Sequence, residues 1–151
     1  MVKRYLFLLL LTMTALATGC ASLGIGQPTE TPVPFNRHTA QDVFSVLSSA
    51  GLEAQNLRRD LVVGRGAPST FSDRYIFEIS RIAPSGGQVL IFETPDGLTE
   101  WQEYIATLRA NNATRRDVVY VFVRGNVMLQ VNANLTTQEA NAYRDALMGM
   151  E

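Results

Sequence analysis

The segment "DVVYVFVRGNVMLQVN", residues 117–132, decides the fold of this chain. It holds two runs of β-branched and aromatic residues on either side of Gly125-Asn126, the residue types that a tight two-residue hairpin turn of the primed kind requires. A two-residue loop also fixes the register of the two strands. Because both faces of the runs are largely apolar, we expect this hairpin near the centre of a sheet. The expected cross-strand pairs are Arg124 with Val127, Val123 with Met128, and Phe122 with Leu129.

A second hairpin is expected upstream of the first. Residues 74–82 ("RYIFEISRI") alternate and are rich in strand-forming types, and residues 88–93 ("QVLIFE") form another such run. The intervening "APSGG" is typical of a turn. A short strand at "LEAQNL" and a long connection over residues 58–74 complete this part of the chain.

Three segments carry the signals of helices. "TAQDVFSVLSSAG" begins with Thr39 and Asp42 at the spacing of a capping box, and "TPDGLTEWQEYIATLRANN" has a proline suited to the first helical position. "LTTQEANAYRDALMGM" has a second capping box at Thr136 and Glu139. The last two helices each follow one of the hairpins.

The order of elements is therefore α-β-ββ-α-ββ-α, which predicts an α+β domain. We expect a two-layer sandwich in which two or three helices pack on a mainly antiparallel sheet of four to five strands. The two hairpin–helix units are either a degenerate internal duplication or two instances of a common unit, and two copies do not decide between them.

Composition limits the classes of function. The chain has 151 residues, 46% of them hydrophobic and 18% charged, and its formal net charge is -1. Lys3 is the only lysine, and residues 20–151 hold 11 arginines against 14 acidic residues. This mild acidity gives no general electrostatic reason to expect nucleic-acid binding.

The N-terminus has the layout of a secretory signal peptide. Two basic residues at positions 3 and 4 precede the apolar run 5–16, and small residues lead to Cys20, the only cysteine. The run is too short to cross a bilayer comfortably. A plain signal peptide with an incidental cysteine and a short uncleaved anchor are the alternatives on these residues alone.

"LATGC", residues 16–20, resembles the lipobox of bacterial lipoproteins. The resemblance implies transfer of a diacylglyceryl group to Cys20 and cleavage between Gly19 and Cys20. One departure is Ala17, which stands where leucine is more usual, while Leu16 lies one place earlier. The expected location is the extracytoplasmic face of a cell membrane, inner or outer, to which the lipid on Cys20 anchors the chain.

This interpretation divides the chain into three parts. Residues 1–19 are the signal peptide, residues 20–38 are the lipidated cysteine and a flexible spacer rich in Pro, Thr and Gly, and residues 39–151 are a single α+β domain. An ordered N-terminal arm is the alternative for the spacer. The mature part resembles small bacterial lipoproteins that have a Thr/Pro-rich spacer, a resemblance that implies no known activity.

No catalytic signature is present in the sequence. His38 is the only histidine, at the entrance of a predicted helix, where a solvated or capping role is the ordinary expectation. No cysteine and histidine spacing suits a metal, so we expect neither a metal nor a cofactor. Glu78 and Glu93 could face each other across one hairpin and do acid–base chemistry, although an open sheet face in water is the more ordinary place for them. Trp101 is expected in the core.

Two basic doublets carry the remaining functional prediction. Arg58 and Arg59, and again Arg115 and Arg116, are each followed by an aspartate. They are either solvated charges in local ion pairs or contacts for an anionic partner, such as lipid headgroups or an acidic envelope polymer.

We therefore expect a lipid-anchored extracytoplasmic binding or accessory module of the bacterial cell envelope, without catalysis. Its partners would be the membrane, through Cys20, and another envelope protein or an anionic envelope polymer, not nucleic acid. The alternatives are a carboxylate-dependent envelope hydrolase and a purely structural envelope lipoprotein.

Overall fold

The computed structural model describes residues 34–151, so Gly19, Cys20 and most of the expected spacer lie outside the described residues. Within residues 34–151 none of the helices is long and apolar enough to cross a membrane. The helices are α2 (Ala40–Ser49), α3 (Pro95–Ala110) and α4 (Thr137–Met148), with short 3₁₀ turns η1 (Ser80–Ile82) and η2 (Arg115–Val118). The strands are β1 (Gln55–Arg59), β2 (Asp73–Glu78), β3 (Gly86–Ile91), β4 (Tyr120–Arg124) and β5 (Val127–Val131).

The strands form one five-stranded sheet in the order β1-β2-β3-β5-β4, and every neighbouring pair is antiparallel. The α+β class and the element order α-β-ββ-α-ββ-α are confirmed. The helix N-termini also agree with the sequence, because Thr39–Asp42 and Thr136–Glu139 both form capping boxes and Pro95 begins α3.

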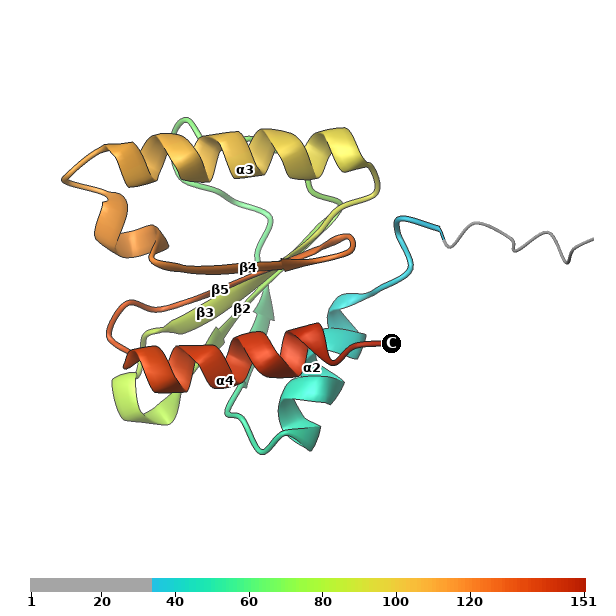
Figure 1. The fold of residues 1–151 in the computed structure, drawn as a ribbon, viewed down its shortest axis with the longest axis vertical. Helices are drawn as coiled ribbons and strands as arrows, with labels where there is room; N and C mark the ends of the chain where they lie inside the picture. Colours follow the sequence, from blue (N-terminus) through green and yellow to red (C-terminus); the bar gives the residue numbers. More distant parts are fainter. Residues whose placement is uncertain (1–33) are drawn as a thin grey trace, which may run out of the picture. The chain divides into compact units, whose positions relative to one another are not determined.

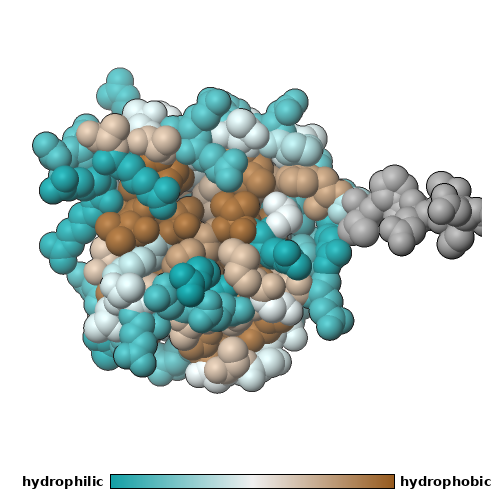
Figure 2. All heavy atoms as spheres, in the orientation of Figure 1, coloured by the Kyte–Doolittle hydropathy of each residue, from teal (hydrophilic) through white to brown (hydrophobic). Residues whose placement is uncertain are grey.

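Helices cover both faces of the sheet, so the domain has three layers where the sequence predicted two (Figure 1). The helices α2 and α4 pack on one face and α3 packs on the other. The reason is visible in β3, where Val89 and Ile91 enter the core under α2 and α4 while Leu90 enters the core under α3. A strand that is apolar on both sides needs a cover on each face. In Figure 2 hydrophobic side chains show between α3 and the sheet, with polar side chains outside them.

The hairpin of β4 and β5 has the predicted register, with Arg124 opposite Val127 and Phe122 opposite Leu129. Gly125 has a φ of +54°, as a primed turn demands of its first central residue. The predicted central position holds for β5, which lies between β3 and β4, and is wrong for β4, which is an edge strand. Both faces of β4 are apolar because a helical layer flanks each face, not because other strands flank it.

The upstream hairpin differs from the prediction at its turn. Gly86 and Gly87 lie inside β3, not in the loop that precedes it. A Cβ on Gly87 would lie 2.5 Å from Cζ of Phe77, because the Phe77 ring occupies the space above this glycine. The glycines are therefore needed for a close approach within the sheet.

The packed domain begins before Thr39, the boundary expected from the sequence. Phe35 packs against the core under α3, whereas Ala40, the first residue of α2, belongs to the core on the other face. The segment 35–39 thus passes around the end of the sheet from one layer to the other. His38 lies in this passage and is buried.

Candidate functional site

A polar groove of about 670 Å³ lies on the sheet face that α3 partly covers. On this face β3 presents Gln88 and then Leu90, and β5 presents Met128 and then Gln130, because side chains of one face recur at every second residue. Leu90 and Met128 are buried under α3, and Gln88 and Gln130 lie beyond it in the groove. The change from leucine and methionine to glutamine therefore sets where the helix cover ends and the groove begins.

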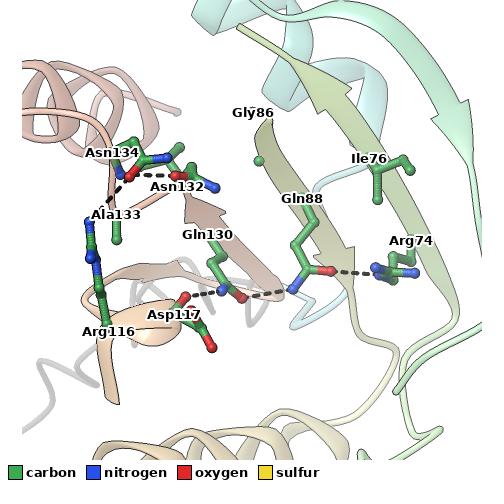
Figure 3. A pocket seen from close by; sticks show the side chains of 12 residues that line it. Arg74, Ile76, Gly86, Gln88, Arg116, Asp117, Gln130, Asn132, Ala133 and Asn134 are labelled. Atoms are coloured by element: carbon green, nitrogen blue, oxygen red, sulfur yellow. Dashed lines mark hydrogen bonds between the residues drawn. The ribbon is translucent and has the colours of Figure 1, made fainter. Parts of the chain in front are cut away.

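A row of hydrogen bonds crosses the floor of this groove from β2 to β5 (Figure 3). Nε of Arg74 donates to Oε1 of Gln88 at 2.6 Å, and Nε2 of Gln88 donates to Oε1 of Gln130 at 2.7 Å. Nε2 of Gln130 then donates to the carbonyl oxygen of Asp117 at 2.6 Å. We call Arg74, Gln88 and Gln130 the polar ladder. Each member fixes the orientation of the next, so the floor is preorganised.

Arg74 is the half-buried cation of the ladder, with 14% of its side chain exposed. Its Nη1 donates to the carbonyl oxygens of Asp60 and Val62 at 2.9 and 2.7 Å. Burial lowers the pKa of the Arg74 guanidinium. Asp60 lies 3.8 Å from Arg74 and 3.3 Å from Arg58, so one carboxylate serves two guanidinium groups and a positive charge is left over.

The rim of the groove adds a second cation and further amides. Nη2 of Arg116 lies 3.4 Å from Oδ1 of Asn134, and the backbone N–H of Asn134 donates to Oδ1 of Asn132 at 2.9 Å. Arg116 takes part in none of the ion pairs formed within residues 34–151. In the described part of the chain, the lining contains one carboxylate, Asp117, and no histidine, cysteine, serine or lysine. These groups can hold carboxylates and hydroxyls by hydrogen bonds.

The structure separates the four arginines that the sequence singled out. Arg58 and Arg59 are exposed on the edge strand β1, where Arg58 pairs with Asp60, and Arg59 pairs with Asp73 at 2.7 Å. The hydrogen bond that Nε of Arg59 donates to the Asp73 carboxylate raises the pKa of Arg59. These two arginines are therefore engaged in local ion pairs.

Arg115 and Arg116 lie in η2, which precedes β4 at the opposite edge of the sheet. They line a surface hollow of about 510 Å³ together with Arg109 and the exposed Val119. Of the four predicted arginines, only Arg116 also lines the groove.

Glu78 and Glu93 are not brought together. Glu78 ends β2 opposite Gly86, whereas Glu93 follows the other end of β3 and is exposed. Oε2 of Glu78 accepts a hydrogen bond from Nδ2 of Asn56 at 2.7 Å. The alternative in which these carboxylates face each other across one hairpin is therefore wrong, because they occupy opposite ends of the two paired strands.

His38 is neither solvated nor part of the groove. Its ring is buried and its Nε2 accepts a hydrogen bond from Nε of Arg37 at 3.0 Å. Burial, and next the charge of Arg37, lower the pKa of His38. The residue sits against the β4–β5 turn, at the end of β5 opposite to Asn132 and the groove. Trp101, expected in the core, is 3% exposed and lies in the core under α3.

The polar ladder is the part of the site that the sequence does not predict. The sequence offers one indication of it, because Gln88 and Gln130 are polar residues at the ends of otherwise apolar runs. Only the pairing of Gln88 directly opposite Gln130 makes them a site.

Comparisons of this chain with family models, with curated proteins and with solved structures found no match. Residues 34–151 contain no group of three or more His, Cys, Asp or Glu side chains that could hold a metal ion. The chemistry of the groove is therefore argued from its own residues.

Proposed function

We propose that this protein is a lipid-anchored, extracytoplasmic binding module of the bacterial cell envelope, and that it holds an anionic, hydroxyl-bearing ligand such as a segment of acidic glycan. The observation that carries the proposal is the polar ladder, with Arg74 at one end and Arg116 at the rim across the groove. The module binds and does not catalyse.

The side chains of the groove match this class of ligand. Side-chain amides donate and accept at once, as sugar hydroxyl groups do, and Gln88, Gln130, Asn132 and Asn134 all line the groove. A guanidinium group binds a carboxylate through two parallel hydrogen bonds. The leftover positive charge at Arg74 and the absence of an ion pair at Arg116 within residues 34–151 favour an acidic ligand over a neutral one.

The anchor part of the proposal rests on the sequence. A lipid on Cys20 would hold the domain close to a membrane surface, and the Pro-containing segment after it would set the distance. A binding module in that position would meet polymers of the envelope at high local concentration.

Calorimetric titration of the full chain with an oligogalacturonate, which has hydroxyls and carboxylates but no acyl group, tests the groove. The protein should be kept in a polyoxyethylene-ether detergent, which brings neither sugar nor charge. We expect saturable binding that weakens as salt is raised. Arg116→Ala should weaken it about tenfold, since a charge-assisted hydrogen bond is lost.

Arg144→Ala is the matched control, because it removes an exposed arginine from α4 on the other face of the sheet. Absence of binding, as expected of a purely structural lipoprotein, would overturn the proposal. An equal effect of the two arginine variants would also overturn it, because the groove would then not be the site.

A further inference from the structure

The surface hollow of about 510 Å³ that Arg109, Arg115, Arg116 and Val119 line is continuous with the groove, because Arg116 belongs to the lining of both. We call it the arginine hollow. We infer that the arginine hollow is a second anion site, and that the ligand is a polyanion with repeated acidic groups that extends from the groove across Arg116 into the hollow. The inference rests on the proposed function and names the ligand class more narrowly.

The three guanidinium groups of the hollow come from two elements that a tight connection brings together. Arg109 belongs to the last turn of α3, and Arg115 and Arg116 belong to η2. The backbone N–H of Arg115 donates to the carbonyl oxygen of Asn111, the residue after α3, at 2.9 Å. This bond holds η2 close to the C-terminal end of α3, as Figure 1 shows.

The arginine hollow carries a surplus of positive charge. Within residues 34–151, none of its three arginines takes part in an ion pair, and its lining contains no acidic residue. Asp117, the acidic residue of η2, lines the groove and not the hollow. Three like charges around one hollow repel each other, so an anion that binds between them is attracted by all three.

The end of a helix accounts for only one of these arginines. Arg109 lies in the last turn of α3, where the helix dipole favours a cation. Its Nε donates to the carbonyl oxygen of Val118 at 3.1 Å, which fixes the guanidinium group and leaves its Nη atoms for a ligand. Arg115 and Arg116 follow α3 and form none of its turns, so the helix dipole does not explain why they line the same hollow.

The continuity of the two sites favours a polymer over a single small anion. A guanidinium group binds one carboxylate through two parallel hydrogen bonds, so a single acidic group engages one arginine fully. A chain of sugar acids has a carboxylate on every sugar and can engage Arg74, Arg116 and Arg115 in turn, with a gain in avidity from each. The side chain of Val119 is 49% exposed and offers apolar surface to the C–H face of a sugar ring.

Calorimetric titration of the full chain with trigalacturonate and with decagalacturonate, in the same detergent, tests the inference. The two probes differ only in the number of repeated sugar acids. We expect decagalacturonate to bind about tenfold more tightly, because a further charge-assisted hydrogen bond forms in the hollow. Arg115→Ala should remove most of this difference and leave the affinity for trigalacturonate unchanged, since Arg115 lines the hollow and not the groove.

Arg144→Ala is again the matched control, because it lowers the net charge by the same amount on the other face of the sheet. A longer oligomer also has more ways to lie in one groove, and this statistical gain would be the same in both variants. A gain that Arg144→Ala keeps and Arg115→Ala loses therefore belongs to the arginine hollow.

Equal affinity for the two oligomers, or an advantage of decagalacturonate that survives Arg115→Ala, would overturn the second site and leave the proposed function standing. If neither oligomer binds, the proposed function fails and the second site fails with it. Lipid headgroups are the other anionic class. Phosphatidylglycerol added to the detergent micelles should preserve the advantage of decagalacturonate over trigalacturonate. Loss of that advantage in the wild type would assign the hollow to headgroups and overturn the inference.

Discussion

The side chain of Asn126 holds both backbone polar groups of His38. Oδ1 of Asn126 accepts a hydrogen bond from the N–H of His38 at 3.0 Å, and Nδ2 donates to the carbonyl oxygen of His38 at 2.8 Å. The two residues are 88 positions apart in the chain, and Asn126 has no exposed surface. A turn residue of the β4–β5 hairpin thus fastens the segment through which the chain enters the domain.

Replacement of Asn126 by alanine should release this segment. Both backbone groups of His38 would be left without partners in a buried place, and each such loss costs about 1–3 kcal/mol. We expect Asn126→Ala to lower the free energy of unfolding by about 2–4 kcal/mol in urea titrations. Asn112→Ala, at an exposed position after α3, is the control and should change it by less than about 0.5 kcal/mol. Equal stability of the two variants would mean that the two hydrogen bonds between Asn126 and His38 contribute nothing to the free energy of unfolding.

The burial of His38 makes stability depend on pH in a defined window. The pKa of His38 in the folded state is lowered by burial and by Arg37, with a smaller opposing effect of Asp42 and a lowering effect of Arg124. The unfolded state therefore binds a proton first, and the contribution of neutral His38 is complete above the unfolded pKa of about 6.5. It is lost as the pH falls from there through the folded value.

Urea unfolding of the wild type and His38→Gln between pH 8 and pH 5 measures this effect. The wild type should lose stability below about pH 6.5, and His38→Gln should stay flat over the same range. Asp42 and Glu139, whose pKa values are lowered by hydrogen bonds from the backbone N–H groups of Thr39 and Thr136, add their own loss only at more acid pH. If the free energy of unfolding of His38→Gln falls with pH as steeply as that of the wild type, the pH dependence belongs to other groups.

Gly125→Val should strain the hairpin turn. The φ of Gly125 is +54°, a region that costs a β-branched residue about 1–3 kcal/mol, and a Cβ there would also lie 3.3 Å from Cδ2 of His38. Gly64→Val is the matched control, because Gly64 has no positive φ and a Cβ added to it would meet no atom within 4 Å. The difference between the two midpoints in urea gives the cost of the turn. No difference would show that the turn does not require glycine.

Gly87→Ala should destabilise the domain more than the addition of a single methyl group usually does. A Cβ at this position would lie 2.5 Å from the backbone oxygen of Gln130 and from Cζ of Phe77. The neighbouring strand cannot move away without breaking the sheet, so we expect a loss of about 3 kcal/mol. Thermal unfolding followed by circular dichroism, with Gly64→Ala as the control, measures it. A melting temperature close to that of the control would show that the strands can separate locally.

Cys20→Ser tests the proposed anchor. Serine cannot receive the thioether-linked lipid, so the variant should accumulate as an unprocessed precursor or leave the membrane as a soluble product. Fractionation after an alkaline wash, with the mass of the N-terminal peptide, reports both outcomes. Recovery of the variant in the membrane, still cleaved before residue 20, would contradict the lipobox interpretation.

The local elements of the fold could be predicted because their signals lie close together in the chain. The register of the last hairpin depends on Gly125-Asn126, and the start of α4 depends on Thr136 and Glu139, three residues apart. In both cases the residues that decide the structure are neighbours, so no distant part of the chain needs to be known.

The candidate site could be predicted only in part, because it is made by strand pairing. The sequence indicates Arg116 as a cation for an anionic partner, and this residue does line the groove. The sequence does not indicate Gln88 and Gln130 as site residues, since a single glutamine at the end of an apolar strand does not by itself predict a binding site. The pairing of β3 with β5 places them opposite each other, 42 positions apart in sequence.

The sequence by itself determined the element order, the helix caps, the hairpin register and the α+β class, because these follow from propensities and hydrogen bonds over a few residues. Only the tertiary structure decided the strand order, the second layer of helix, the edge position of β4 and the separation of Glu78 from Glu93. These features depend on which elements, distant in the sequence, pack against each apolar face of the sheet. The groove exists because α3 covers Leu90 and Met128 and leaves Gln88 and Gln130 open, a choice made by packing across the whole sheet.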